Sequence, residues 1–146
     1  MLQSSASQEV ALAEELGFIR SYVEIEQMRL GERLQVTWDV DETLLGARVP
    51  SLILQPLVEN AIQHGIAASA RAGALTIRAR GEAGFLVLQV RDTGPGMSRA
   101  SADTGGGIGL ANTRLRLQRL YGERQKFEFV EADGLVVTVR IPLDTP

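Results

Sequence analysis

The stretch of chain from Thr93 to Gly107 is rich in glycine, and it leads directly into a helical pattern. Glycine and proline interrupt both helices and strands, so this stretch must be a loop. The residues that follow, from Ile108 to Tyr121, have the spacing of a helix, and Gly122 stands where a left-handed residue commonly ends one. The helices and strands in the rest of the chain must therefore be arranged around a long loop that ends at the start of a helix.

Hairpin patterns lie on both sides of this loop. Apolar residues alternate with polar ones, as in half-buried strands, and turns with Gly81 and Gly84 or with Asp133 and Gly134 separate the strands of each pair. The predicted strands are 34–40, 44–49, 75–80, 85–92, 127–131 and 136–142, and the predicted helices are 8–30, 50–64 and 108–121. Strand pairs that alternate with single helices indicate an α+β fold, a two-layer α/β sandwich in which a mixed, mostly antiparallel sheet carries helices on one face.

The long N-terminal helix predicted for Gln8–Leu30 has two apolar stripes. The first is Leu12, Leu16, Ile19, Val23 and Leu30, and the second is Phe18, Tyr22 and Ile25. Together they make an apolar face wider than a single surface contact needs, so we expect this helix to pack on two partners. Because the helix precedes the alternation of strands and helices, residues 1–31 are predicted to form a unit separate from residues 32–146.

Composition excludes several classes of protein. The formal net charge of −3 and the pI of about 5.2 provide no basic surface for nucleic acid. The sequence has no cysteine, and therefore no disulfide framework. It contains neither an apolar run long enough to span a membrane nor an N-terminal signal peptide, and we expect a cytoplasmic location.

Gly105, Gly107 and Gly109 alternate at the start of the last predicted helix. Backbone N–H groups can approach an anion closely where no Cβ intervenes, and a helix N-terminus adds partial positive charge. The pattern favours a phosphate site, although a flexible surface loop would have the same composition. A P-loop would end in Gly-Lys-Ser/Thr, and a dinucleotide fold would place its glycines directly after a first strand, so neither fits.

Two other segments carry polar residues suited to a nucleotide. Asp92 ends an apolar strand, where its carboxylate can accept a hydrogen bond from an exocyclic amine such as that of adenine, but a polar turn would use the same residues. Asn60 and His64 are four residues apart in a predicted helix and should share a face. An amide oxygen suits Mg²⁺ and an imidazole suits a phosphate oxygen, whereas the alternative for His64 is a basic residue favoured in a last helical turn.

The three segments together resemble the GHKL ATP-binding superfamily, which includes histidine kinases, gyrase B, MutL and Hsp90 and has the Bergerat fold. PLVENAIQHG (56–65) resembles its N box, DTGPGM (92–97) its G1 box and GGGIGLAN (105–112) its G2 box. From about Ala13 onward the chain is similar to LytS-type sensor histidine kinases, a group that also contains the AlgZ-like sensors.

The resemblance implies a role for each matching residue. Asn60 would coordinate the Mg²⁺ that bridges the ATP phosphates, His64 would contact phosphate, and Asp92 would bind the adenine amine. Glu59 would activate the acceptor histidine or arrange metal-bound water, and residues 98–106 would form a lid over the nucleotide. The remaining implied nucleotide ligands are Gly94, Gly96, Gly105, Gly107, Gly109, Leu110 and Arg114, with Arg116 as a second source of positive charge.

The residue four positions before Asn60 distinguishes two chemistries within this superfamily. Hydrolytic members carry a glutamate there as a base for water, but here the position is Pro56. Phosphoryl transfer to an imidazole requires mainly positioning and charge neutralisation. Pro56 therefore favours an ATP-dependent protein histidine kinase over an ATPase of the gyrase or MutL kind. The glycines, Asn60 and Asp92 speak against a non-catalytic dimerisation module, and the long N-terminal helix and the LYG at 120–122 favour a sensor kinase over an anti-sigma-factor serine kinase.

His64 is the one histidine of the sequence. The phosphoacceptor histidine is therefore predicted to lie outside this sequence, and the resemblance to LytS-type kinases implies that it lies upstream, on a helix that pairs with residues 8–30 in a dimeric bundle. The resemblance further implies a homodimer through this helical region, relay of the phosphoryl group to a response regulator of the LytTR type, and a membrane anchor only in upstream segments. We expect the chain to bind ATP and Mg²⁺ without phosphorylating itself.

Overall fold

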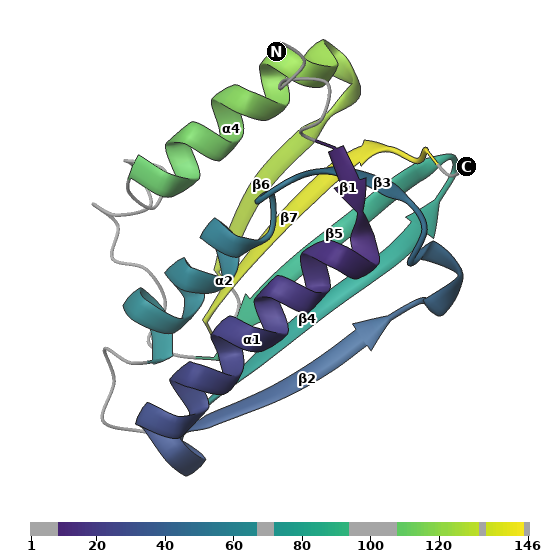
Figure 1. The fold of residues 1–146 in the computed structure, drawn as a ribbon. Coiled ribbons are helices and arrows are strands. Elements are labelled where there is room, and N and C mark those ends of the chain that lie inside the picture. The colour runs from purple at the N-terminus through teal and green to yellow at the C-terminus, as the bar shows by residue number, and fades with distance from the viewer. Residues whose placement is uncertain (1–8, 67–71, 94–107, 132–133, 145–146) are drawn as a thin grey trace, which may run out of the picture.

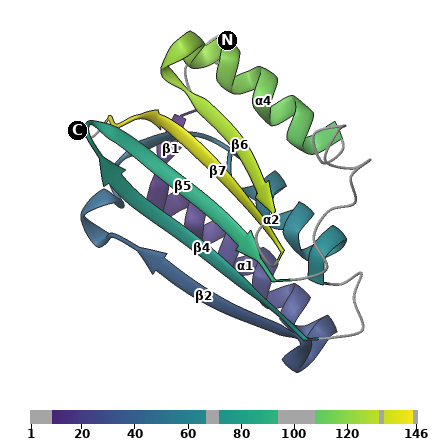
Figure 2. The same ribbon diagram turned by 180° about the vertical axis from the view of Figure 1, so that it is seen from behind.

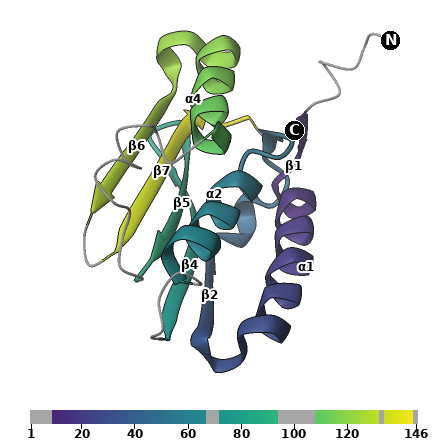
Figure 3. The same cartoon turned by 90° about the vertical axis from the view of Figure 1, so that its left-hand side faces the viewer.

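The computed structural model describes residues 9–66, 72–93, 108–131 and 134–144, which form a five-stranded sheet and a layer of helices on one of its faces (Figures 1 and 3). The strands of this sheet are β2 (Leu34–Val40), β4 (Gly73–Glu82), β5 (Phe85–Asp92), β6 (Lys126–Glu131) and β7 (Leu135–Pro142). The helices are α1 (Leu12–Leu30), α2 (Gln55–Asn60), a π-helix that continues α2 (Ala61–Ile66) and α4 (Ile108–Tyr121). This arrangement confirms the predicted α/β sandwich.

The strands lie side by side in the order β2-β4-β5-β7-β6. β2 runs parallel to β4 and the other neighbouring pairs are antiparallel, as predicted for a mixed sheet. A parallel pair needs a crossover connection, and the chain between β2 and β4 passes through α2. The hairpin between β4 and β5 turns at Ala83 and Gly84, whose φ angles of 51° and 85° are those of a two-residue primed turn. Gly81, which we expected in the turn, belongs to β4.

Alternate residues of the central strands point into the helical layer. Those of β5 are Leu86, Leu88, Val90 and Asp92, and those of β7 are Leu135, Val137, Val139 and Ile141; all are buried. The residues between them, such as Gln89 and Arg91, lie on the opposite face, which no described helix covers (Figure 2). Full burial of one such aliphatic side chain stabilises the fold by about 1.5–3 kcal/mol.

Helix α1 packs into the same core as the sheet. The whole of its first predicted stripe is buried, from Leu12 to Leu30. In the second stripe Phe18 and Ile25 are 53% and 62% exposed. Of the two contacts expected for α1, the one made by the first stripe is therefore with this domain. Gly31 ends the helix with a φ of 60°, as predicted. None of the described helices, α1 included, is long and apolar enough to cross a membrane.

The start of the N-terminal helix differs from the prediction of 8–30. Residues Glu9–Ala11 form strand β1, which pairs antiparallel with β3 (Arg48–Pro50). The N–H of Leu12 then donates to the carbonyl of Ala47 at 2.8 Å, which satisfies one of the donors that a helix start leaves without an intrahelical partner. The partner strand is distant in the chain, so local periodicity did not reveal it.

The predicted strand 44–49 and the predicted helix start at Pro50 are both shifted. Pro50 belongs to β3, residues 51–54 form a turn, and α2 begins at Gln55. Leu52 within this turn has a φ of 59°, which excludes the right-handed helical conformation at that position. The helix that carries the N-box residues is therefore shorter at its start than its sequence pattern indicates.

A pair of matched substitutions tests whether α1 is part of the core. Ile19 is fully buried whereas Ile25, on the same helix, is 62% exposed. We expect Ile19→Ala to lower the free energy of unfolding by about 2–5 kcal/mol, because it leaves a cavity. Ile25→Ala should change it by less than about 0.5 kcal/mol, as for a surface position. Urea denaturation of both variants measures the difference, and equal effects would show that α1 is not docked in solution.

Candidate functional site

The helix formed by α2 and the π-helix carries the three N-box residues. Asn60, the last residue of α2, is 8% exposed. Glu59 is half-buried and accepts a hydrogen bond from Gln55 Nε2 at 3.0 Å, which fixes its orientation. His64 is exposed. We expected Asn60 and His64 to share a face, but the π-helix closes its hydrogen bonds over five residues instead of four and alters the helical phase between them.

Asp92 is the last residue of β5 and is 2% exposed. Its carboxylate belongs to the sheet face that the helices cover, because it continues the buried alternation of Leu88 and Val90. The next residue, Thr93, donates its N–H to the carbonyl of Ala74 at 3.0 Å and accepts the Ala74 N–H on Oγ1 at 2.8 Å. These bonds to the neighbouring strand hold the strand end, and with it the carboxylate, in place.

Gly134, in the hairpin between β6 and β7, lies against the backbone of Asp92. A Cβ atom on Gly134 would be 1.9 Å from the Asp92 carbonyl oxygen, and the φ of Gly134 is 128°. Both facts require glycine at this position. From the sequence we expected Gly134 only in a turn, because a contact with a residue so distant in the chain has no local signal.

The start of α4 is the third part of the candidate site. α4 begins at Ile108, as predicted, with Gly109 in its first turn. Leu110 and Thr113 are buried, at 1% and 5% exposure. The predicted ligands Gly94, Gly96, Gly105 and Gly107, together with the predicted lid 98–106, lie outside the described residues.

Two of the three arginines of α4, Arg114 and Arg116, have contacts that the sequence did not predict. The guanidinium of Arg114 lies over the rings of Phe127 and Phe129 in β6, 5.3 and 5.6 Å from their centroids. Arg116 donates a hydrogen bond to the carbonyl of Ser51, in the turn before α2. A role for either arginine in binding phosphate stays a prediction.

The three parts of the candidate site are neighbours. α2 contacts α4, and the π-helix contacts β4 and β5. The end of α2, the end of β5 and the start of α4 lie on the same side of the molecule, the left in Figure 1. A buried amide, a buried carboxylate and a helix N-terminus are thereby gathered on one side of the fold, as a nucleotide site requires.

The described residues include no group of three or more His, Cys, Asp or Glu side chains that could hold a metal ion. Asn60 offers a single amide oxygen. Mg²⁺ commonly takes one or two protein ligands and completes its octahedron with water and substrate phosphates. The residues present therefore fit Mg²⁺ as the companion of a nucleotide and do not fit an independent metal centre.

Glu15 is a polar residue of the helical layer that the sequence analysis did not single out. It is 1% exposed, and its carboxylate accepts the N–H groups of Leu52 and Leu54, both at 2.9 Å. A signal for it was present, because Glu15 lies three residues after Leu12 and four before Ile19, within the buried stripe of α1. A charge in an apolar stripe indicates a buried polar partner.

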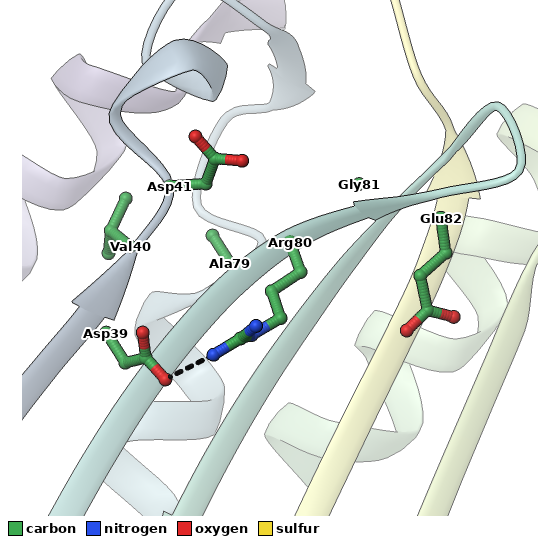
Figure 4. A pocket seen from close by; sticks show the side chains of 7 residues that line it. All are labelled: Asp39, Val40, Asp41, Ala79, Arg80, Gly81 and Glu82. Carbon is green, nitrogen blue, oxygen red and sulfur yellow. Dashed lines mark hydrogen bonds and ion pairs between the residues drawn. The ribbon is translucent and has the colours of Figure 1, made fainter.

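A shallow pocket beside the end of β2 is separate from the candidate site (Figure 4). Its lining residues are Asp39, Val40, Asp41, Ala79, Arg80, Gly81 and Glu82. Arg80 and Arg78 donate to Asp39 at 3.0 and 2.9 Å, and the hydrogen bond from Arg80 lowers the pKa of Asp39. Exposed ion pairs of this kind stabilise little. The pocket lies at the hairpin end of β4, remote from Leu75, the residue that pairs with Asp92.

Two profiles of known protein families match the chain. The family profile described as histidine kinase-, DNA gyrase B- and HSP90-like ATPase matches residues 47–145. The chain belongs to this GHKL ATPase family. A second profile, described as histidine kinase, matches residues 1–34 of the GHKL chain.

Curated relatives of this GHKL chain are sensor kinases. The sensor histidine kinase YesM of Bacillus subtilis is 38% identical over an alignment of 136 positions that covers 89% of this chain and 24% of YesM. The sensor protein LytS of Enterococcus faecalis is 28% identical over an alignment of 155 positions that covers 98% of this chain and 26% of LytS. The expected similarity to LytS-type kinases is confirmed, and the chain spans about a quarter of the length of these relatives.

Solved structures show the same fold. The histidine kinase domain of the blue-light activated histidine kinase EL346 from Erythrobacter litoralis has a TM-score of 0.71 at 24% identity, over 92% of this chain and 62% of that one. The catalytic domain of histidine kinase ThkA has a TM-score of 0.70 at 18% identity, over 94% of this chain and 97% of that one. The GHKL chain therefore has the fold of histidine kinase catalytic domains.

The contact between Gly134 and Asp92 is testable by substitution. Gly134→Ala forces a backbone shift at a positive φ, and we expect it to destabilise the fold by about 2 kcal/mol or more. Gly84→Ala is the matched control, because Gly84 has a φ of 85° with nothing within 4 Å of its Cβ position, so it carries the strain without the clash. Thermal denaturation compares the two, and an equal loss in both variants would mean that the Asp92 contact adds nothing.

Proposed function

We propose that this GHKL chain binds ATP with Mg²⁺ and transfers the γ-phosphoryl group to a histidine outside these 146 residues, as the catalytic part of a two-component sensor histidine kinase. The observation that carries the proposal is the buried carboxylate of Asp92 at a strand end, on the side of the fold where the helix of Asn60 ends and α4 begins. The similarity to sensor kinases along most of the chain supports it.

Each polar residue of the site has a task in this proposal. Asp92 accepts a hydrogen bond from the adenine amine, and because its carboxylate is 2% exposed, little water competes for that bond. Asn60 offers its amide oxygen to Mg²⁺, and His64 reaches the phosphates from the exposed side of the π-helix. When bound, Mg²⁺ neutralises charge on the phosphate oxygens.

Two features of α2 support phosphoryl transfer over hydrolysis. Pro56 lies in the first turn of α2, four residues before Asn60, and offers no base to a water molecule. Glu59 is half-buried and held by Gln55, and it is the carboxylate we propose as the group that orients or activates the acceptor imidazole. Positioning and charge neutralisation then supply most of the catalysis.

The acceptor and the partners lie beyond the domain in this proposal. His64 is the one histidine of the sequence and belongs to the proposed nucleotide site, so the acceptor is a different histidine. Phe18, Ile25 and Met28 of α1 are 53%, 62% and 86% exposed and offer an apolar stripe to the acceptor helix of a homodimer. We propose a cytoplasmic domain, tethered to the membrane through other segments, that passes the phosphoryl group to a response regulator of the LytTR type.

Nucleotide titration tests the binding site. With calorimetric titration of ATP in the presence and absence of Mg²⁺, we expect Asp92→Ala to weaken binding about tenfold or more, since it removes a hydrogen bond to a charged group. Asn60→Ala should abolish the difference between the titrations with and without Mg²⁺. Asp39→Ala, which removes a carboxylate in the pocket of Figure 4 whose side chain is 38% exposed, is the control and should bind as the wild type does. A wild-type chain that binds no adenine nucleotide would refute the proposal.

Self-phosphorylation tests the location of the acceptor. Incubated with ATP labelled on its γ-phosphate, the chain should acquire no acid-labile label, although it binds the nucleotide in the same sample. Strong acid-labile labelling would contradict the proposal. Rapid release of labelled phosphate without protein labelling would instead support an ATPase.

A further inference from the structure

The turn 51–54, which leads into α2, is held by a buried carboxylate from another helix. Glu15 of α1 accepts the N–H groups of Leu52 and Leu54, both at 2.9 Å, and is 1% exposed. Leu54 is the residue that precedes the first turn of α2. A carboxylate at the start of a helix satisfies unpaired backbone donors and interacts favourably with the helix dipole. Here that carboxylate is supplied by α1 and not by the local sequence.

The same turn has a strained backbone. Leu52 has a φ of 59°, in the left-handed region that residues with a side chain seldom occupy, and its side chain is 53% exposed. Such a conformation costs about 1–2 kcal/mol and persists only where its surroundings enforce it. The apolar side chain of Leu52 is too exposed to hold this backbone conformation by packing. The hydrogen bonds to the turn therefore hold it.

A second helix holds the turn from another direction. Arg116 of α4 donates a hydrogen bond to the carbonyl of Ser51, directly before Leu52. Arg116 is half-buried and lies about two helical turns after the start of α4. The predicted phosphate-binding glycines end at that start. The turn is thus tied to α1 through its N–H groups and to α4 through a carbonyl group.

α1 also contacts the π-helix that continues α2. Gln63, which lies in the π-helix directly before His64, donates a hydrogen bond from Nε2 to the hydroxyl oxygen of Tyr22 at 3.2 Å. Burial raises the pKa of Tyr22, so its hydroxyl stays neutral at ordinary pH. The contacts of Glu15 and Tyr22 show that α1 runs beside α2 and the π-helix in the same direction, and Figure 3 shows the two helices adjacent on one face of the sheet.

From these contacts we propose that Glu15 and Arg116 are positioning residues of the nucleotide site, and that they couple the docking of α1 to the affinity for ATP. α2 is a short rigid element, so fixing the turn at its start fixes the direction in which Asn60 is presented. If α1 moves, Glu15 leaves two N–H groups unpaired, the strained turn relaxes and Asn60 shifts. By linkage, ATP must then favour the docked position of α1 to the same extent. This inference rests on the proposed function.

The test uses substitutions that retain shape. Glu15→Gln retains one acceptor oxygen but places an NH₂ group opposite the second backbone N–H, and Arg116→Gln removes the charge and shortens the side chain. Glu26→Gln is the matched control, because Glu26 is a second buried carboxylate of α1, 8% exposed, which bonds to Arg29 and not to the turn. All are made in the 146-residue chain, and circular dichroism confirms that each is folded before ATP and Mg²⁺ are titrated calorimetrically.

We expect Glu15→Gln and Arg116→Gln each to weaken ATP binding about fivefold or more, within the range usual for coupled sites. Glu26→Gln should lower the melting temperature yet bind ATP as the wild type does. Wild-type affinity in both folded positioning variants would overturn the inference and leave the proposed function intact, whereas a wild-type chain that binds no ATP would overturn both. If Glu15→Gln does not fold, the ATP affinity of Arg116→Gln alone decides whether the inference holds.

Hydrogen exchange provides a second readout that a purely structural role would not change. Saturating ATP should slow exchange of the Leu52 and Leu54 amides in the wild type, because the nucleotide stabilises the docked arrangement. The slowing should disappear in Arg116→Gln, whose substitution leaves Glu15 in place. Exchange at these amides that does not respond to ATP in the wild type would also overturn the coupling.

Discussion

Burial of a single face of the sheet under the helices determines where the polar groups of the site lie. In β5 the alternation that places Leu86, Leu88 and Val90 in the core continues to Asp92, so a carboxylate is carried into the helical layer by the same geometry that buries the aliphatic side chains. A shift of the strand by one residue would turn all of them to the open face. The hydrogen bonds between Thr93 and Ala74 hold the strand end against such a slip.

Elements with strong local periodicity were predictable from the sequence. α4 begins and ends at the predicted residues, and β5 agrees with its prediction at both ends, because alternation and helical spacing are properties of neighbouring residues. Asp92 was singled out by a motif at the end of β5, and Asn60 by a motif in α2, whose predicted start was wrong. Contacts between distant segments were not predictable: the pairing of β1 with β3, the backbone of Gly134 against Asp92 and the carboxylate of Glu15 under the turn 51–54 have no local signature beyond a charge within an apolar stripe.

α1 has two relationships to the rest of the chain. A histidine kinase profile covers residues 1–34, and the ATPase profile begins only at residue 47. Yet the inner stripe of α1 is buried in the core of the ATPase domain, and Glu15 and Tyr22 bond to elements beyond residue 50. The division after residue 31 therefore stays a prediction about evolutionary and functional units, whereas the packing joins both sides of it.

The order of the strands has a consequence for biosynthesis. β7 is the last of the described strands in the sequence, yet it lies between β5 and β6 in the sheet and pairs with both. While the chain emerges from the ribosome, β5 has an unpaired edge until β7 has been made, and Asp92 has no Leu135 beside it. A stalled or truncated product that lacks β7 would therefore expose a sheet edge prone to aggregation.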